Sequence, residues 1–413
     1  MKNPLIPMGA ITGPMTRGEI AAMMRRYADV GIEQFLFYAR GGCDVPFMSE
    51  EWLDICENIV LEAESLGIDI WLYDEYDCPS GTCHKTIIAD HPEFESACIC
   101  VEDGKCSVVR GSAYVKMADL LNPAVTDLFI ERTYEQLYLR LGDKFGKVIK
   151  GVFTDEPSLM YKSRDAYLKY PYTDGIENEY RERFGADLFD GLAAGDEKCL
   201  ADYISLLGEK LRSSYVDKVA AWCEAHGVLM TGHLLGEEDI RTAVMASGDA
   251  LRVLRGFSVP GMDEIWTHIG KDTEWLTLAT VSAASRYKKN GALAELFAFG
   301  PCDQPIARML QMIDLAALFG VDKYVLAVSA CDAKGSAVKT DWLDPTNFMQ
   351  PYFECFREFS EEAKRASRLA GKKIAADVAI VYPSRDEASG RGKSACVVGE
   401  KLMKLINDLN DRQ

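Results

Sequence analysis

Basic residues and histidines are scarce in this chain of 413 residues. Lysine and arginine together number 46 against 64 aspartates and glutamates, which gives a formal net charge of −18. Nucleic acids and anionic membranes are bound through basic patches, so this charge argues against both as partners. Only five histidines occur, and none forms an H-x-H or H-E-x-x-H pair, which argues against a dinuclear zinc hydrolase. Neutral or cationic ligands fit the charge better.

Long apolar runs are also missing. No stretch approaches the roughly 18 apolar residues of a membrane span, and residues 1–20 lack the apolar core of a signal peptide. We therefore expect a soluble, cytoplasmic protein. The 13 cysteines show no C-x-x-C spacing of a structural zinc site, so we interpret them as reduced, packed thiols. A G-x-S-x-G nucleophile motif and a dinucleotide fingerprint after the first strand are absent as well.

Apolar runs alternate with amphipathic helical segments up to about residue 370, a pattern typical of a parallel α/β fold. Eight β/α units in series predict a (β/α)₈ TIM barrel, whose catalytic groups lie at the carboxyl ends of the strands. A doubly wound sheet is the alternative. The predicted strands are Leu5–Ile11, Gln34–Ala39, Asp69–Tyr73, Val148–Thr154, Val228–His233, Gly256–Pro260, Ala292–Phe297 and Tyr324–Ser329.

Six helical segments are predicted between these strands, and two regions depart from the short-loop pattern. The helices are Arg17–Asp29, Ser49–Ser65, Pro123–Leu141, Leu200–Ala225, Thr273–Lys289 and Pro305–Phe319. An insertion at about 76–122 holds a β-hairpin around Asp103-Gly104, within SACICVEDGKCSVVRG. We assign residues 1–372 to the barrel and 373–413 to the start of a flavodoxin-like β/α unit. We expect this unit to be truncated, because a single β/α unit cannot bury its own apolar faces.

The stretch GVFTDEPSLM places Asp155 and Glu156 at the end of an apolar run, with no basic residue in 157–160. A glycosidic bond is cleaved by one carboxylic acid that protonates the leaving oxygen and a second carboxylate that attacks the anomeric carbon or activates a water. In a barrel, Glu156 after the fourth strand and Glu295 on the seventh face each other across the mouth. We predict these two glutamates as the catalytic pair. Asp155, as a neighbouring like charge, is expected to favour the protonated form of Glu156.

Further candidate side chains lie at other strand ends. The stretch WLYDEYDCPSG after the third strand offers the aromatic rings and carboxylates that line sugar subsites. Asp74 and Glu75 are favoured as hydroxyl ligands, with a salt-bridge role as the equal alternative. Arg40 is expected to bind a hydroxyl or to hold one of the glutamates. The predicted substrate-binding residues are Arg40, Asp74, Glu75, Asp77, Asp155, His233, Asp263, Trp266 and Phe297.

Other functions stay open as alternatives. A barrel that binds carbohydrate without cleaving it would need the same lining. In such a barrel, a buried Arg40–Glu295 ion pair would explain why a carboxylate lies on an apolar strand. A Schiff-base lyase or aldolase is disfavoured because Lys323 lies at a strand start, the wrong end of the barrel. We expect no cofactor, with calcium as the alternative, because calcium sites leave little trace in a sequence. A homo-oligomer is also compatible with the sequence.

Three motifs resemble one enzyme family. The strand-end sequence YDEYDCPSG, the helix start DLLNPAVTDLFI and FTDEP together resemble the barrel of family 106 glycoside hydrolases, the α-L-rhamnosidases, over about residues 5–370. DEP at the end of the fourth strand and a glutamate on the seventh also resemble clan A glycosidases, which include β-galactosidases. The segment IAADVAIVYP resembles the flavodoxin-like domain that follows the barrel in several of these groups.

The resemblance implies Glu156 as general acid and Glu295 as the second catalytic glutamate. In the rhamnosidases this second glutamate acts as base in an inverting reaction near a calcium ion, whereas in clan A proper it is the nucleophile of a retaining one. The sequence departs from clan A at Asp155, where that clan has an asparagine that binds the sugar 2-hydroxyl. Family 106 enzymes are also longer, so we expect either a shortened chain or a shorter intracellular relative acting on small imported glycosides.

Overall fold

The computed structural model describes most of the chain. The described residues are 2–40, 42–111, 116–160, 169–264, 272–298, 303–331, 346–348, 350–370 and 381–385. Among the predicted site residues, Trp266 falls outside these ranges. Most of the predicted C-terminal unit at 373–413 also lies outside them, so the division into a barrel and a flavodoxin-like unit stays a prediction.

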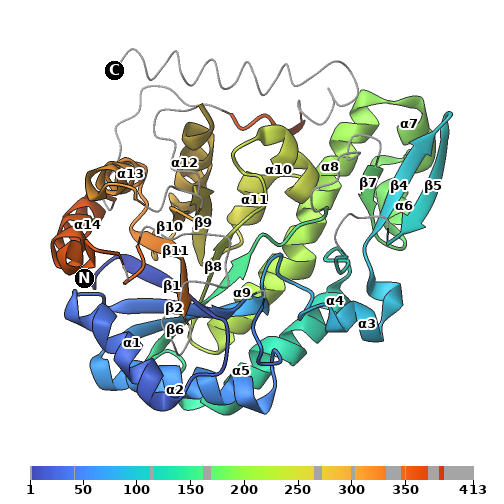
Figure 1. The fold of residues 1–413 in the computed structure, drawn as a ribbon. Coiled ribbons are helices and arrows are strands. Elements are labelled where there is room, and N and C mark those ends of the chain that lie inside the picture. The colour runs from blue at the N-terminus through green and yellow to red at the C-terminus, as the bar shows by residue number, and fades with distance from the viewer. Residues whose placement is uncertain are drawn as a thin grey trace, which may run out of the picture.

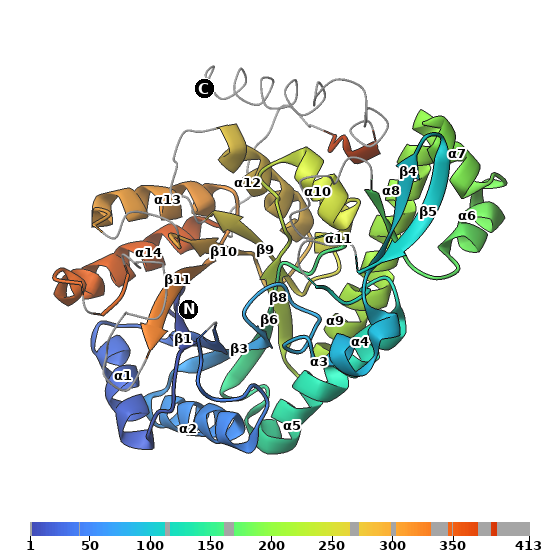
Figure 2. The same ribbon diagram turned by 45° about the vertical axis from the view of Figure 1, so that its right-hand side comes forward.

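Eight parallel strands close into a barrel, with neighbours in the order β1, β11, β10, β9, β8, β6, β3, β2. Figures 1 and 2 show helices around the outside of this barrel. The predicted (β/α)₈ architecture is therefore confirmed. The strands are β1 Leu5–Ile11, β2 Gln34–Ala39, β3 Asp69–Tyr76, β6 Ile149–Asp155, β8 Leu229–His233, β9 Val259–Glu264, β10 Leu293–Leu296 and β11 Lys323–Cys331.

Strand β9 is the one barrel strand whose position differs clearly from the prediction. The sequence predicts a strand at Gly256–Pro260 that ends at its proline, whereas β9 starts three residues later, at Val259. Pro260 is the second residue of the strand, a position near the strand start where a missing N–H group is tolerated. Because of this shift, Asp263 lies within the strand and not in the loop that follows it.

Several helices begin after residues that the sequence marks as caps. Thr16 forms a capping box with Glu19, and the side chains of Ser49 and Asn122 accept main-chain N–H groups of the first turns that follow them. The helices are α1 Arg17–Asp29, α2 Glu50–Leu66, α3 Thr86–Asp90, α4 Pro123–Phe129, α5 Glu135–Leu141, α6 Ile176–Phe184, α7 Leu188–Ala194, α8 Glu197–Leu211, α9 Asp217–Ala225, α10 Ile240–Ser247, α11 Ala250–Leu254, α12 Asp272–Ser285, α13 Ile306–Leu318 and α14 Phe356–Ala370.

Two long segments that the sequence predicts as continuous helices each contain a π-helical turn, one after α4 and one after α8. Each turn carries a tyrosine that reaches the outer face of the barrel. Tyr134 donates a hydrogen bond to Asp74 on β3 at 2.6 Å, and the hydroxyl of Tyr215 bonds that of Thr154 on β6 at 2.7 Å. These helices are therefore fixed to the strands that lead to the barrel mouth.

A three-stranded antiparallel sheet stands beside the barrel and joins two of its loops. β4 Ala97–Glu102 and β5 Lys105–Arg110 form the predicted hairpin, and β7 Lys169–Tyr172 pairs with the free edge of β4. In both ribbon views this sheet lies on the side of the barrel away from α13 and α14 (Figures 1 and 2). Since β4 follows β3 and β7 follows β6, the sheet ties together the loops after these two barrel strands.

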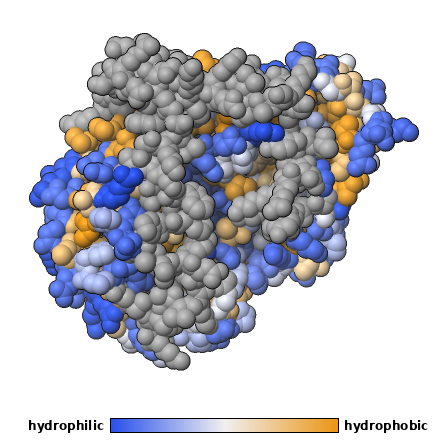
Figure 3. Space-filling view, turned by 45° about the horizontal axis from the view of Figure 1, so that its top comes forward, coloured by the Kyte–Doolittle hydropathy of each residue, from blue (hydrophilic) through white to orange (hydrophobic). Residues whose placement is uncertain are grey.

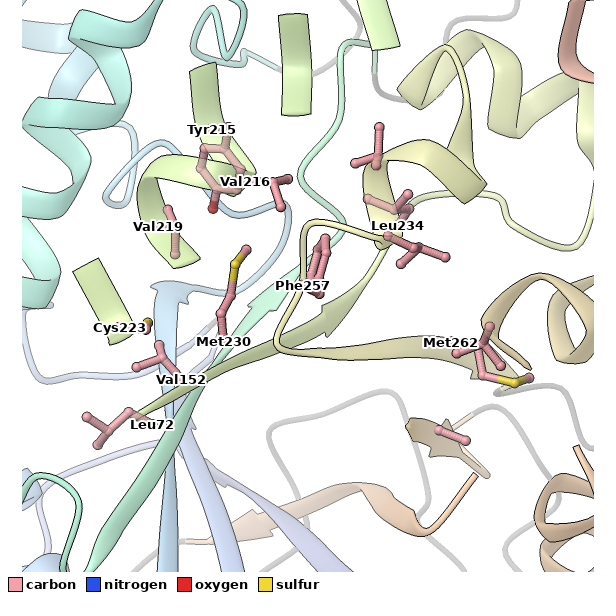
Figure 4. Close-up of a cluster of buried hydrophobic side chains, with 14 of the residues drawn as sticks. Leu72, Val152, Tyr215, Val216, Val219, Cys223, Met230, Leu234, Phe257 and Met262 are labelled. Atoms are coloured by element: carbon pink, nitrogen blue, oxygen red, sulfur yellow. The ribbon is translucent and has the colours of Figure 1, made fainter. Parts of the chain in front are cut away.

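Side chains of the barrel strands alternate between two hydrophobic clusters. Inward residues such as Tyr73 and Phe153 fill the barrel interior. Outward residues pack against the helices, and Figure 4 shows Val152 and Met230 of the strands facing Val219 of α9 in this outer cluster. Successive residues of a strand point to opposite faces, so the same alternation decides where each polar residue at a strand end points.

The outer surface is polar in the view of Figure 3, where hydrophilic residues cover most of the coloured area and the hydrophobic areas are scattered. None of the helices in the described ranges combines the length and the apolar composition needed to cross a membrane. Ten cysteines in these ranges are free thiols, and several, such as Cys56 and Cys223, are buried. This agrees with their interpretation as packed thiols.

Gly232 in strand β8 is a position that only glycine fits. Its φ is +132°, and a Cβ atom there would lie 1.8 Å from the carbonyl oxygen of Thr154 on β6. We predict that Gly232→Ala lowers the free energy of unfolding by about 2–4 kcal/mol, measured by urea denaturation. Gly18→Ala in α1 is the control, because a Cβ atom there meets nothing within 4 Å. A Gly232→Ala variant as stable as the control would contradict this close approach of β6 and β8.

Candidate active site

Alternation along the strands directs Asp155 and Glu295 into the mouth of the barrel. Asp155 ends β6 and shares a face with Phe153, which belongs to the barrel interior. Glu295 lies in β10 and shares a face with Leu293, another interior residue. Glu295 is only 6% exposed, so its carboxylate needs partners within the protein.

His233 supplies such a partner from the end of β8. Its Nε2 atom lies 3.0 Å from Oε2 of Glu295 and 3.1 Å from Oδ1 of Asp155. Asp155 and His233 are direct neighbours in the register of β6 and β8, which brings them to the same level of the barrel. The other ring nitrogen is 3.5 Å from the carbonyl oxygen of Leu234, too far for a strong hydrogen bond. His233 therefore makes its close polar contacts with the two carboxylates.

Tyr73 extends these contacts to strand β3. Its hydroxyl donates to Oδ2 of Asp155 at 2.5 Å, so each oxygen of this carboxylate has a protein partner. The Tyr73 ring is stacked with that of Phe153, with centroids 5.8 Å apart, and Phe153 meets the His233 ring edge-on at 5.7 Å. The polar chain from Tyr73 to Glu295 thus lies against packed aromatic rings that limit its movement.

The charges of the site act against one another. Burial raises the pKa of Glu295, whereas the hydrogen bond and charge of His233 lower it; Asp155 adds to the rise, and the net effect is a raised pKa. Burial alone would lower the pKa of His233, but Asp155 and Glu295 raise it well above its ordinary value. His233 is therefore held in its protonated form as a buried cation between two acids.

Asp263 is a further acid beside Glu295. The two residues are register neighbours on β9 and β10, and Oδ1 of Asp263 is buried without a hydrogen-bond partner. Burial raises the pKa of Asp263 well above its ordinary range, with His233 opposing and the charges of Glu295 and Glu156 adding to the rise. A buried polar atom without a partner is costly, so this oxygen is suited to a ligand hydroxyl.

Glu237 is a buried carboxyl group in the loop after β8, with 5% exposure. It accepts the main-chain N–H of Leu234 at 2.7 Å and that of Asp263 at 3.3 Å. Burial raises its pKa to about 7, while the charge of His233 lowers it. Glu237 therefore links the carboxyl ends of strands β8 and β9, and both of its oxygens accept hydrogen bonds from the protein main chain.

Glu156 directly follows β6 in a left-handed backbone conformation, with φ of 48°. Residues other than glycine adopt this conformation rarely, and such strain is concentrated at functional sites. The chain is fixed on both sides of it: the N–H of Ser80 donates to the carbonyl of Asp155 at 2.7 Å, and that of Leu159 to the carbonyl of Ala246 at 2.8 Å. The Glu156 side chain is partly exposed, and its charge acts on the neighbouring acid of β9.

Arg40 and Asp77 lie together at the rim of the mouth. Nη1 of Arg40 donates to the hydroxyl of Tyr38 at 2.5 Å and lies 3.7 Å from Oδ1 of Asp77. The side chain of Arg40 is 14% exposed and that of Asp77 is 40% exposed. The charge of Arg40 acts on Glu295, whose pKa it lowers against the larger effect of burial. Asp77 is the more open of the two to a ligand.

Asp74 and Glu75 have their carboxylates occupied by protein groups. Asp74 lies on the outer face of β3, where Ser80 and Tyr134 each donate to it at 2.6 Å, and burial raises its pKa to about 7. Glu75 accepts the main-chain N–H groups of residues 82–84 at 2.5 to 2.8 Å. Side-chain hydroxyls occupy the carboxylate of Asp74, and main-chain N–H groups of the following loop occupy that of Glu75. We therefore leave both acids out of the proposed sugar contacts.

Two predicted aromatic contacts have different outcomes. Phe297 is 0% exposed and belongs to the hydrophobic core, so it offers no surface on which a sugar could stack, and we leave it out as well. Trp266 lies outside the described residues, and its role stays a prediction. The rings of Tyr38 and Tyr73 lie 4.6 Å apart and are buried in the barrel interior.

Asp155, His233 and Glu295 each offer one atom that could bind a metal ion, and these three atoms lie within 4.8 Å of one another. Calcium takes six to eight oxygen ligands, whereas this set includes an imidazole nitrogen. The set therefore does not match the calcium site that the sequence leaves open. Separations of 3.0 and 3.1 Å from Nε2 are those of N–H···O hydrogen bonds, and we assign the three groups to an ion-paired cluster and not to a metal centre.

Sequence reasoning missed residues that support the site from outside the barrel. The Ser80 hydroxyl accepts the N–H of Asp155 at 2.8 Å and donates to Asp74. The turn sequence CPSG is a local signal that could have drawn attention to Ser80. Tyr134 has no such signal, because it reaches Asp74 from a helix 60 residues away.

Comparison with known proteins finds structures of similar fold. No protein-family model matches the chain, and no curated protein matches it. A rhamnosidase from Novosphingobium sp. PP1Y matches 89% of this chain at 11% identity, with a TM-score of 0.66. A β-galactosidase from the Antarctic haloarchaeon Halorubrum lacusprofundi matches 95% at 13% identity, with a TM-score of 0.56. GH5_18 from Streptomyces cattleya, in complex with GlcNAc, matches 98% of this chain and 91% of its own at 12% identity, with a TM-score of 0.50.

These similarities concern the barrel. The chain spans 59% of the length of the rhamnosidase chain and 63% of that of the β-galactosidase chain. At 11 to 13% sequence identity, a shared fold does not show that two proteins have the same activity or the same substrate. The fold expected from the resemblance to family 106 is confirmed, and membership of that family stays a prediction.

Glu75 offers a test of how the loop beside the site is held. We predict that Glu75→Gln lowers the free energy of unfolding by about 1–3 kcal/mol, because its amide group would face main-chain donors that the carboxylate now accepts. Limited proteolysis should show new cleavage within residues 77–85. Glu93→Gln, at an exposed position, is the control. Wild-type stability together with an intact loop would show that Glu75 does not hold this segment.

Proposed function

We propose that this protein is a glycosidase in which Glu156 and Glu295 are the two catalytic carboxyl groups. Glu156 is assigned as the general acid because it directly follows β6 at the barrel mouth and its side chain is partly exposed, and so is open to the leaving oxygen of a bound glycoside. Glu295 is assigned as the second carboxylate because Nε2 of His233 lies 3.0 Å from its Oε2 atom and, together with the charge of Arg40, opposes the rise that burial causes in its pKa. Together they supply the acid and the anion that cleavage of a glycosidic bond requires.

The ion-paired Glu295 carries this proposal. An ionised carboxylate in a barrel interior costs several kcal/mol unless a cation and hydrogen bonds compensate for it. Glu295 lies between apolar neighbours on β10 and has His233 at 3.0 Å as its counter-ion. A carboxylate kept there at such a cost is suited to attack an anomeric carbon or to activate a water.

The proposed substrate is a small glycoside or oligosaccharide. Asp77 at the rim and the unpartnered oxygen of Asp263 supply polar contacts for sugar hydroxyls, with Arg40 beside them. An α-L-rhamnoside is the first candidate, because the sequence motifs and the fold similarity both point to rhamnosidases. A β-galactoside, cleaved with retention, is the second, supported by the fold similarity to a β-galactosidase. A cytoplasmic location belongs to the same proposal and follows from the sequence alone.

A barrel that binds carbohydrate without cleaving it is the competing proposal. It is favoured by the contacts of Glu295 themselves, because an ion pair with His233 also gives the carboxylate a structural role. Both proposals predict sugar binding at the barrel mouth. They differ in turnover, which the next experiment measures.

Glu156→Gln and Glu295→Gln are each expected to lower kcat/KM by about 100- to 10,000-fold. The substrates are aryl α-L-rhamnoside, β-D-galactoside, β-D-glucoside and α-L-arabinoside. The loss for Glu156→Gln should be smaller with an acidic nitrophenol leaving group than with an alkyl alcohol, because a good leaving group needs less protonation. Steady-state kinetics on both kinds of leaving group would measure this difference.

The control for both variants is Glu224→Gln, at an exposed position of α9, which should keep wild-type kinetics. Unchanged turnover in a folded Glu156→Gln or Glu295→Gln variant would remove that residue from the mechanism. Sugar binding by the wild type without turnover of any substrate would favour the non-catalytic barrel.

We further propose that the reaction needs no cofactor, because carboxyl groups perform both the proton transfer and the attack. Dialysis against EGTA is then expected to leave kcat/KM unchanged. A loss of activity that added calcium restores would establish the calcium alternative.

A further inference from the structure

Asp155 and His233 direct their polar atoms to the protein and not to open space. The two oxygens of Asp155 meet the hydroxyl of Tyr73 at 2.5 Å and Nε2 of His233 at 3.1 Å. His233 has 1% exposure, and its Nε2 atom is already shared by two carboxylates. The sequence predicts both residues as sugar ligands, yet both oxygens of Asp155 and Nε2 of His233 already have partners within the protein.

We propose that Tyr73, Asp155 and His233 form a positioning chain that holds the carboxylate of Glu295, and that none of the three is a sugar ligand. The catalytic meaning of this chain rests on the proposed glycosidase function, whereas its existence does not. Each member fixes the next. The Tyr73 hydroxyl donates a hydrogen bond to one oxygen of Asp155. The other oxygen of Asp155 lies against Nε2 of His233 and orients its imidazole, and the same Nε2 atom contacts Oε2 of Glu295.

The surroundings of the chain leave it little freedom. The N–H of Asp155 donates to the hydroxyl of Ser80 at 2.8 Å, which fixes the main chain at the end of β6. The His233 ring meets Phe153 edge-on at an interplanar angle of 70°, and Tyr73 is stacked on the same phenylalanine at 14°. One phenylalanine of the barrel interior therefore sets the planes of both rings in the chain.

The chain also supplies the charge that Glu295 needs. The titratable and charged groups around Glu295 and His233 come from β2, β3, β6 and β9 and from the loops after β2, β6 and β8: Tyr38, Arg40, Tyr73, Asp155, Glu156, Glu237 and Asp263. Acids predominate in this set, and His233 lies in hydrogen-bond contact with Glu295. Loss of the His233 charge would therefore lead Glu295 to take up a proton, and an uncharged Glu295 can act neither as nucleophile nor as base.

The chain itself can be tested without any substrate. Because the protein contains five histidines, ¹⁵N-histidine NMR can follow each imidazole through a pH titration. One imidazole, absent in His233→Gln, is expected to stay doubly protonated through the neutral range. Asp155→Asn, which keeps the size of the side chain, should lower the pH at which this imidazole titrates and serves as the second variant if His233→Gln does not fold. A His233 that titrates near pH 6.5, its ordinary value, would overturn the proposal.

The role of the chain in catalysis is tested by the pH dependence of kcat/KM in His233→Gln, which keeps a hydrogen-bond donor but loses the charge. The pKa of Glu295 should rise, so the acid limb of the profile moves to higher pH. A shift of one unit lowers kcat/KM on that limb about tenfold, while KM changes little. His91→Gln, at an exposed position far from the site, should leave the profile unchanged.

The two tests separate the outcomes. A lower kcat/KM in His233→Gln with an unmoved acid limb would overturn the positioning role, because a residue that is only structural lowers activity without changing the ionisation of Glu295. If the wild type turns over no sugar, the proposed function fails, and the NMR titration alone decides whether the chain exists.

Discussion

The contacts of His233 with Asp155 and Glu295 are the constraint on which the rest of the site depends. Burying an ionised carboxylate costs several kcal/mol unless a cation and hydrogen bonds compensate for it, and removing one partner of such a pair costs about 3–5 kcal/mol. Because one imidazole nitrogen serves two carboxylates, the positions of the two acids fix each other. The second oxygen of Asp155 then needs its own donor, which Tyr73 supplies from the neighbouring strand.

The parallel barrel brings these groups together through strand register and through one contact between β8 and β10, which are not neighbours in the barrel. Asp155 lies beside His233 on β6 and β8, and Asp263 lies beside Glu295 on β9 and β10, so two neighbouring strand pairs build the charged mouth. Glu156 depends on more. Its left-handed conformation lies in a loop that the small sheet ties to the insertion after β3. The second carboxylate of the proposed reaction is therefore fixed by the barrel, and the acid by the loops around it.

Much of the fold could be predicted from the sequence, because strands buried on both faces read as continuous apolar runs. Strands β1 and β2 match their predicted bounds, whereas the proline in β9 hid a strand that starts just before it. Alternation was enough to place Glu295 in the mouth. Its partner was not predictable in this way, since His233 is 62 residues distant. The hydrogen bonds from main-chain N–H groups to Glu75 depend on the geometry of the loop, which a single sequence predicts poorly.

A crystal structure with a bound iminosugar, which imitates the charge of a glycosidase transition state, would test the central claim most directly. We expect its ring between Glu156 and Glu295, with Nε2 of His233 still on both carboxylates and no sugar hydroxyl on Asp155. The distance between the two catalytic carboxyl groups would then indicate retention at about 5 Å or inversion at about 6.5–9.5 Å. An iminosugar bound away from Glu295, or one whose hydroxyl replaces His233 on Asp155, would contradict it.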